Sequence, residues 1–332
     1  MKGLFLPLKN QGKIQTALVL ALLLSLVLSA VWGKQHFLLG DIAEIIRRTA
    51  NPMKQWLFFD LWLPRTLTAA GAGAALGAAG AVFQSLTRNP LGSPDIIGIN
   101  AGAAVGAVAA GLLWPGYLSI TQGALLGALM VLVLVLLGTR GRLSFGMEII
   151  VSGLAVNAAA MALVQFGLTG VREESAQQMA AWLSGSLEAR SWQHVFTAWT
   201  AMPLLLACLM ALNTRLSLLA LGRDTASGLG VPLKSSSWLL LLAATALAAT
   251  AVTVAGPVPF LALAAPHIVR RLMKTDRPMI MPAAVTGAVL LVAADLAARL
   301  LPTGAPLPVG IVTAAFGGLY LALLLSVKPK AV

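Results

Sequence analysis

Charged residues are scarce in this sequence. Asp, Glu, Lys and Arg make up 10% of the 332 residues, whereas 58% are hydrophobic and the mean hydropathy is +0.88. A soluble domain contains about 25% charged residues. The composition therefore excludes a soluble globular protein and indicates an integral membrane protein.

Cysteine and the common catalytic motifs are also nearly absent. The single cysteine, Cys208, excludes an internal disulfide and a thiolate metal site. No G-x-x-x-x-G-K-[ST] segment occurs, so we expect this chain not to hydrolyse ATP. The few ionisable residues are dispersed rather than gathered in one pocket, so we expect no catalytic residue, no metal site and no cofactor bound by this chain.

Long apolar runs define the fold class. They are continuous over about 20 residues, as in membrane-spanning helices, whereas barrel strands would alternate. We predict one all-α transmembrane domain over residues 1–332. A signal peptide would also show the lysines that precede the first run, but "SAVWGKQ" is a poor cleavage site, so we expect a retained helix. Ten runs are long enough, the eighth being the shortest: 14–32, 63–86, 96–114, 118–138, 147–169, 192–212, 236–255, 258–273, 280–300 and 308–326.

The basic residues that give the net charge of +12 are placed along the chain as expected from membrane topology. Basic residues lie between apolar runs rather than on one soluble face, which argues against nucleic-acid binding. An even number of spans places both termini on one side, and the positive-inside rule makes that side cytoplasmic. The fifteen basic residues then inside are Lys2, Lys9, Lys13, Arg88, Arg140, Arg142, Arg215, Arg223, Lys234, Arg270, Arg271, Lys274, Arg277, Lys328 and Lys330. The eight outside are Lys34, Arg47, Arg48, Lys54, Arg65, Arg172, Arg190 and Arg299.

The polar segment "GRDTASGLGVP", residues 222–232, interrupts two apolar runs and would lie in the cytoplasm, within a loop at about 213–235. We expect Asp224 to cap a short helix, with Gly228 or Gly230 ending it. A solvated connector is the plain alternative. Glycines and small residues permit close backbone approach, which favours a compact loop that docks on another protein.

Two outer arginines stand near helix ends. Arg65 begins the second span, after an amphipathic segment "GDIAEIIRRT" expected along the outer surface, and Arg299 ends the ninth. Arg65 could be a headgroup anchor. Asp295 lies four residues before Arg299, so the two could neutralise each other locally, or Arg299 could project to a partner.

Two inner segments combine helix signals with polar groups. In "FQSLTRNPLGSPDIIGIN", residues 83–100, Ser93 fits a helix N-cap, Pro94 the first helical position and Asp95 the positive end of the helix dipole. The polar residues before them either meet headgroups or line the inner mouth of a path. "AGPVPFLALAAPHIVRRL", residues 255–272, is broken by prolines, as are helices near transport paths. His267 is expected to be packed or hydrogen-bonded rather than a metal ligand.

These segments, together with "LWLPRTL", "LLALGRDTASGLGV" and "LPVGIVTAAFGGLYLALLL", occur in the order and spacing of the FecCD family. The chain resembles these permease subunits of ABC importers for iron-siderophore complexes, haem and cobalamin, from about residue 15 to 326. The resemblance implies ten transmembrane helices, two ATP-binding cassette subunits that carry ATP and Mg, a second permease subunit that is identical or a paralogue, and a periplasmic binding protein. It also implies location in a bacterial cytoplasmic membrane.

The resemblance also implies site residues. The loop that docks into the ATPase subunits corresponds to Gly222, Arg223, Asp224, Ala226, Leu229 and Gly230. Arg65 and Arg299 match arginines that pair with glutamates of the binding protein, although Trp62 replaces the first arginine of the family's R-x-P-R pattern. The cytoplasmic gate corresponds to Asn89, Pro90 and Leu91.

The cargo is the least determined feature. The segments look most like those of ferric-siderophore permeases, especially for catecholates, and haem or cobalamin are the alternatives. An ion-coupled secondary transporter would normally carry ionisable residues near the midplane of its spans, and only Asp295, expected nearer the outer end, approaches this. An intramembrane enzyme lacks any matching motif.

Overall fold

The computed structural model describes residues 8–32, 39–114, 116–138, 147–170, 173–302 and 307–326. Every regular element in these ranges is helical, which agrees with the predicted all-α fold. Six helical segments are long and apolar enough to cross a membrane, and three further apolar helices are shorter. Seven basic residues used in the topology argument lie outside the described residues: Lys2, Lys34, Arg140, Arg142, Arg172, Lys328 and Lys330.

The elements follow one another in simple order along the chain. The N-terminal half contains α1 (Leu8–Val31), α2 (Leu39–Ile46), α3 (Pro52–Trp56), the π-helical stretch η1 (Leu57–Trp62), α4 (Leu63–Thr87), the 3-10 turn η2 (Pro94–Ile97), α5 (Ile99–Leu113), α6 (Ile120–Gly138) and α7 (Met147–Thr169). The C-terminal half contains α8 (Glu173–Leu183), α9 (Trp192–Ala211), α10 (Asn213–Ala220), α11 (Arg223–Gly228), α12 (Leu233–Ala255), α13 (Leu261–Met273), α14 (Ile280–Leu300) and α15 (Val309–Ser326).

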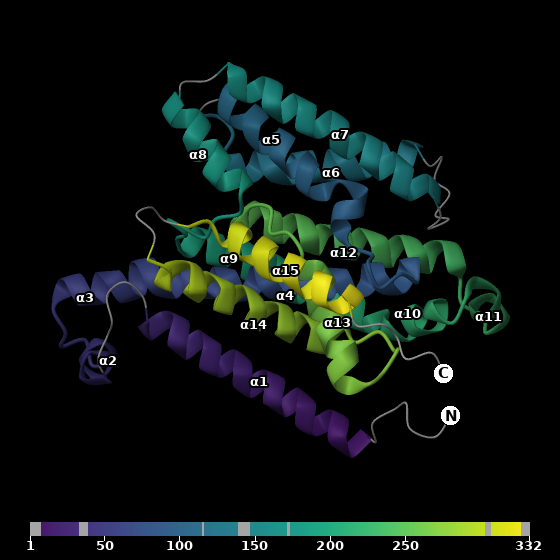
Figure 1. The fold of residues 1–332 in the computed structure, drawn as a ribbon, viewed down its shortest axis with the longest axis horizontal. Coiled ribbons are helices and arrows are strands. Elements are labelled where there is room, and N and C mark those ends of the chain that lie inside the picture. The colour runs from purple at the N-terminus through teal and green to yellow at the C-terminus, as the bar shows by residue number, and fades with distance from the viewer. Residues whose placement is uncertain are drawn as a thin grey trace.

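Helix α4 is the centre of the molecule. It lies among α9, α12, α13 and α14, and α1 runs along the outside of α14 (Figure 1). Nearly all residues of α4 are buried, most of them alanine or glycine. In a bilayer, helices associate through close packing of small residues rather than through the hydrophobic effect. The composition of α4 therefore explains why this helix becomes the core.

Glycines bring the central backbones into contact. A Cβ added at Gly77 would lie 2.1 Å from the carbonyl oxygen of Ala283 on α14, and one at Gly80 would lie 1.8 Å from that of Ala262 on α13. Helices α5 and α6 meet in the same way, with Gly106 against Gly123. Any larger residue at these positions requires the helices to separate.

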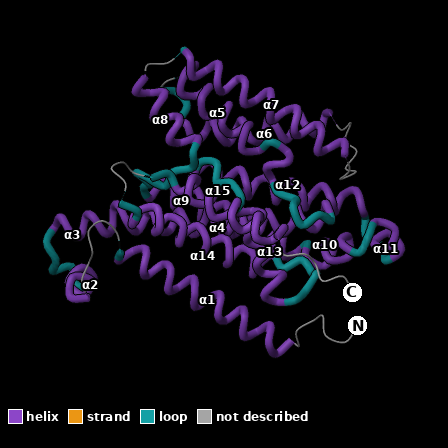
Figure 2. Tube along the Cα trace, viewed as in Figure 1, coloured by secondary structure: helices purple, strands orange, loops and turns teal. Residues whose placement is uncertain are grey.

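Helices α5, α6, α7 and α8 form a second group on the far side of α12 (Figure 2). Helices α5 and α6 also pack on α12, which joins the two groups. The outward faces of α6 and α7 are apolar, with Met130, Leu137 and Phe166 more than half exposed. Such faces suit lipid or another membrane subunit rather than water.

The predicted spans correspond to helices of the described part but differ from them at their ends. Each of the ten runs contains one helix of the described part. The third span begins at Ile99 rather than 96, because the residues before it form the separate turn η2. The second begins earlier in the chain, since α3, η1 and α4 form one helical segment from Pro52 to Thr87. The shortest run gives α13, of 13 residues.

Candidate functional site

An ion cluster joins α4 and α14 at one end of the molecule. Asp295 on α14 is fully buried, and the guanidinium of Arg65 on α4 binds it side-on. Arg65 Nη2 lies 2.7 Å from Asp295 Oδ1, and Arg65 Nε lies 3.0 and 3.1 Å from the two carboxylate oxygens. Two parallel N–H donors on one carboxylate give strength and fixed geometry.

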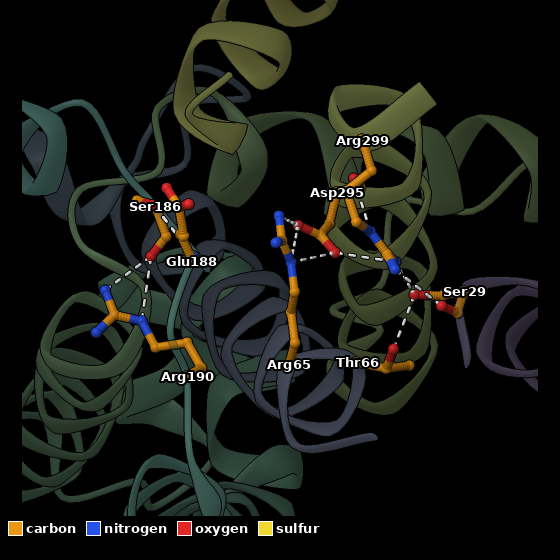
Figure 3. Close-up of polar contacts among 8 residues, drawn as sticks. All are labelled: Ser29, Arg65, Thr66, Ser186, Glu188, Arg190, Asp295 and Arg299. Atoms are coloured by element: carbon orange, nitrogen blue, oxygen red, sulfur yellow. Dashed lines mark hydrogen bonds and ion pairs between the residues drawn. The ribbon is translucent and has the colours of Figure 1, made fainter. Parts of the chain in front are cut away.

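Arg299 approaches the same carboxylate from its other side (Figure 3). Its Nη2 lies 3.1 Å from Asp295 Oδ2, so the local pair, one of the two alternatives that the four-residue spacing left open, is formed. The guanidinium also donates to the Ser29 carbonyl, at 3.0 Å, and to the Ser29 hydroxyl on α1. Ser29 in turn contacts the hydroxyl of Thr66. Three helices are thus tied to one acidic group.

Arg190 is a third arginine at this end, and sequence reasoning did not single it out. It lies in the loop before α9 and donates through Nε and Nη2 to the Ser186 carbonyl, at 3.2 and 2.8 Å. No described carboxylate forms an ion pair with it, although Glu188 is in the same loop (Figure 3). Burial, together with the charge of Arg65, lowers the pKa of Arg190 to about 10, so it stays cationic at neutral pH.

The outer cluster, defined as Arg65, Arg190, Asp295 and Arg299 and named for the side on which the sequence predicts it to lie, therefore has a formal excess of two positive charges. Arg299 is more enclosed than Arg65, with 9% of its side chain exposed against 20%. Such a surface can attract an acidic partner. Trp62, which replaces the first arginine of the R-x-P-R pattern, is buried in a small core with Ile45 and Ala50.

A tight turn follows α4 at the opposite end. Arg88 ends the helix in the left-handed conformation, and the Asn89 side chain accepts a hydrogen bond from the Leu91 backbone at 2.9 Å. Leu91 is exposed, whereas Gln84, in the last turn of α4, is buried. The expected gate residues Asn89, Pro90 and Leu91 therefore form one exposed turn.

Gln84 connects this turn to α13. Its amide donates to the Leu263 carbonyl at 3.0 Å, and its oxygen accepts from Arg270 at 2.5 Å. Among the polar residues at the end of span two, Gln84 is thus not merely a headgroup contact, because it has its hydrogen bonds within the protein. Pro90 borders a cavity lined by basic residues of α13.

Ser93 stands at an N-cap position, as predicted, but the helix that it precedes is not the predicted one. Ser93 and Pro94 occupy the N-cap and first position of η2, not of the third span, and Ser93 makes no capping hydrogen bond. Gly98, with φ +82°, turns the chain into α5. Burial raises the pKa of Asp95 to about 6, against a side-chain hydrogen bond with Asn100 that lowers it.

The segment 222–230 forms a short helix, as expected, but Asp224 is not its cap. Gly222 holds the N-cap position with φ +122°, and Asp224 is the second residue of α11. Only Gly222 tolerates that backbone angle without strain, which explains the shift. Gly230, with φ +78°, ends the turn, and the Val231 amide donates to the Ala226 carbonyl at 3.0 Å.

The α10–α11 loop presents apolar side chains outward. Leu221 and Leu229 are 67% and 60% exposed, while Ala226 between them is buried. A Cβ at Gly222 would lie 3.9 Å from Arg88 Nη1, so this loop and the gate turn are neighbours. The first turn of α1 and the last of α15 lie toward the same end as α10 and α11 (Figure 1).

The remaining polar residues give no metal centre among the described residues, where no three His, Cys, Asp or Glu side chains gather. His267 is hydrogen-bonded through Nδ1 to the hydroxyl of Tyr320 on α15, as the sequence led us to expect of a packed histidine.

Comparison with known proteins gives a consistent result over nearly the whole chain. The FecCD transport family matches residues 20–327. The ferric enterobactin transport system permease protein FepG of Escherichia coli is 38% identical over 92% of this chain and 94% of its own. The vitamin B12 import system permease protein BtuC of Klebsiella pneumoniae is 33% identical over 90% of this chain and 89% of its own.

A solved structure shows the same fold. The inward-facing conformation of a metal-chelate type ABC transporter superposes with a TM-score of 0.85 at 29% identity, covering 95% of this chain and 99% of the other. The chain therefore belongs to the FecCD transport family, as a permease component of an ABC importer.

Proposed function

We propose that this chain is the permease subunit that carries a ferric siderophore, of the catecholate kind, across the bacterial cytoplasmic membrane. The observation that carries the proposal is the family match over residues 20–327, with a ferric enterobactin permease among its relatives. A cobalamin permease is also among them, so cobalamin, like haem, is the second candidate cargo.

The proposed arrangement has ten membrane-spanning helices and both termini in the cytoplasm. The excess of basic residues in the loops on the α10–α11 side supports this orientation. A loaded periplasmic binding protein docks on the outer cluster, two permease subunits form the path between them, and two ATP-binding cassette subunits dock on the α10–α11 loop. ATP binding and hydrolysis in those subunits change which side of the path is open.

Cargo is tested by uptake in cells that have or lack this chain. Radiolabelled iron is supplied in several purified ferric siderophores, with labelled haem and cobalamin as comparators. We expect loss of uptake for one siderophore class alone. Selective loss of haem or cobalamin uptake would replace the cargo assignment while leaving the importer role in place.

The coupling role is tested at Leu229. Leu229→Asp is expected to lower uptake about tenfold or more, because burying a leucine at an interface contributes about 1.5–3 kcal/mol and each 1.4 kcal/mol is a factor of ten. Leu229 is a better target than Gly230, where φ +78° would strain any side chain. The chain should still insert, since Leu229 is exposed.

Thr214→Asp is the matched control. It adds the same charge at an exposed site of α10, outside the apolar surface formed by Leu221 and Leu229. Uptake and ATPase activity are measured for both variants. Full uptake by Leu229→Asp would show that the Leu229 side chain is not part of the coupling surface.

Binding-protein docking is tested at Arg190. Arg190→Gln should raise the dissociation constant about fivefold at low salt, because one interfacial ion pair contributes about 1 kcal/mol at most when partly exposed. The difference should shrink at high salt, and Arg190→Lys should retain most of the affinity. Surface plasmon resonance with the purified importer measures both effects, and a salt-independent loss would indicate a structural role instead.

A further inference from the structure

An apolar groove of about 450 Å³ runs between α13, α14 and α15. Its walls include Phe260, Leu290, Ala293 and Phe316, and its described lining offers few polar groups apart from the hydroxyls of Thr313 and Tyr320. Ala293 and Phe316 are exposed, so the groove opens to the surroundings of the chain. In a membrane protein, such a groove accommodates hydrocarbon.

A basic pocket of about 630 Å³ lies at the C-terminal end of α13. Arg270, Arg271 and Lys274 line it together with His267, and Asp276 is the one acidic residue in its described lining, which leaves a formal excess of two positive charges. No ion pair within 4 Å neutralises these cations among the described residues. The pocket is suited to an anion.

The groove and the pocket share a wall. His267 lines the pocket, Tyr320 lines the groove, and the two side chains are hydrogen-bonded to each other. Ile268, next to His267 on α13, faces the groove. The surface along α13 is therefore amphiphilic, with an apolar part toward the middle of the helix bundle and a basic part at the end of α13.

We propose that this joint surface binds one anionic phospholipid of the inner leaflet, with an acyl chain in the groove and the phosphate against Arg271 and Lys274. The direction fits, because the basic end of α13 is cytoplasmic in the proposed orientation and the groove runs from there toward the membrane centre. Basic pockets between helices on the cytoplasmic side recognise anionic headgroups. The inference depends on that orientation but not on the proposed cargo.

Native mass spectrometry of the purified full chain tests the site. The chain is titrated with phosphatidylglycerol and with phosphatidylcholine of identical acyl chains. We expect preferential retention of phosphatidylglycerol. The double variant R271Q/K274Q should reduce that preference about 30-fold, from a factor of about five for each basic residue near an anionic headgroup.

Two matched variants separate this site from general attraction. Lys13→Gln combined with Arg215→Gln removes the same charge from exposed residues expected on the same side, and should leave the preference unchanged. Ala293→Phe fills the groove and should lower retention of both lipids, whereas Ala207→Phe, on the exposed face of α9, should not.

Equal losses in the two charge variants would overturn the proposal, because the preference would then be a general surface effect. Competition by inorganic phosphate that matches phosphatidylglycerol would also overturn it in favour of a free anion. The same holds if Ala293→Phe changes only association with a second permease subunit, since the groove would then be a subunit contact. Lipid retention is measured without transport, so failure of the proposed function would be seen separately, in the uptake experiment.

Discussion

Gly80→Ala is expected to destabilise the folded chain by about 3 kcal/mol, at the upper end of the cost of overpacking. A Cβ at Gly80 would lie 1.8 Å from the carbonyl oxygen of Ala262, which belongs to the backbone of α13. No change of rotamer relieves such a contact, so α4 and α13 must separate. Unfolding in mixed detergent micelles, followed by circular dichroism, measures the effect.

Gly318→Ala is the matched control. Gly318 also lies within a helix, but nothing is within 4 Å of its added Cβ. Alanine is favoured over glycine in helices by up to about 1 kcal/mol, so this variant should equal or exceed the parent in stability. Equal stability of the two variants would show that α4 and α13 do not approach as closely as described.

Asp295→Asn is expected to lower the free energy of unfolding by about 3–5 kcal/mol, the cost of removing one partner from a buried ion pair. Asp295 is fully buried and is the carboxylate shared by Arg65 and Arg299. Asparagine keeps the size and one acceptor oxygen but leaves two guanidinium groups without a counter-charge. The same micelle unfolding assay measures this loss.

The change Asp224→Asn removes a carboxylate from an exposed position of α11 and should leave stability nearly unchanged. Adding Arg65→Gln to Asp295→Asn should recover part of the loss, because one unpaired cation is then removed. No recovery in the double variant would mean that the two side chains do not interact.

The sequence predicted the helices well because the decisive signal is local. Continuous apolar runs of about 20 residues identify spans without knowledge of their neighbours. Helix ends were predicted less well. The turn η2 and the cap at Gly222 depend on positive φ angles at Gly98 and Gly222, whereas the sequence indicated Ser93 as the cap of the third span and Asp224 as the cap of the short helix.

The site could be predicted only in part, because its contacts join distant segments. The pair between Asp295 and Arg299 follows from helical spacing. The pair between Asp295 and Arg65 joins residues 230 positions apart, and Gln84 meets Arg270 across 186 positions. Arg190 was counted among the basic residues expected outside, but nothing in its spacing placed it near Arg65.

ATP-dependent iron accumulation in proteoliposomes tests the central claim most directly. The vesicles contain this chain with its second permease and ATPase subunits, and the loaded binding protein is added outside. We predict that ferric-siderophore accumulation requires both the binding protein and internal ATP, and that it continues when an ionophore collapses the ion gradients. Accumulation that proceeds without the ATPase subunits and stops with the ionophore would identify an ion-coupled transporter and contradict this account.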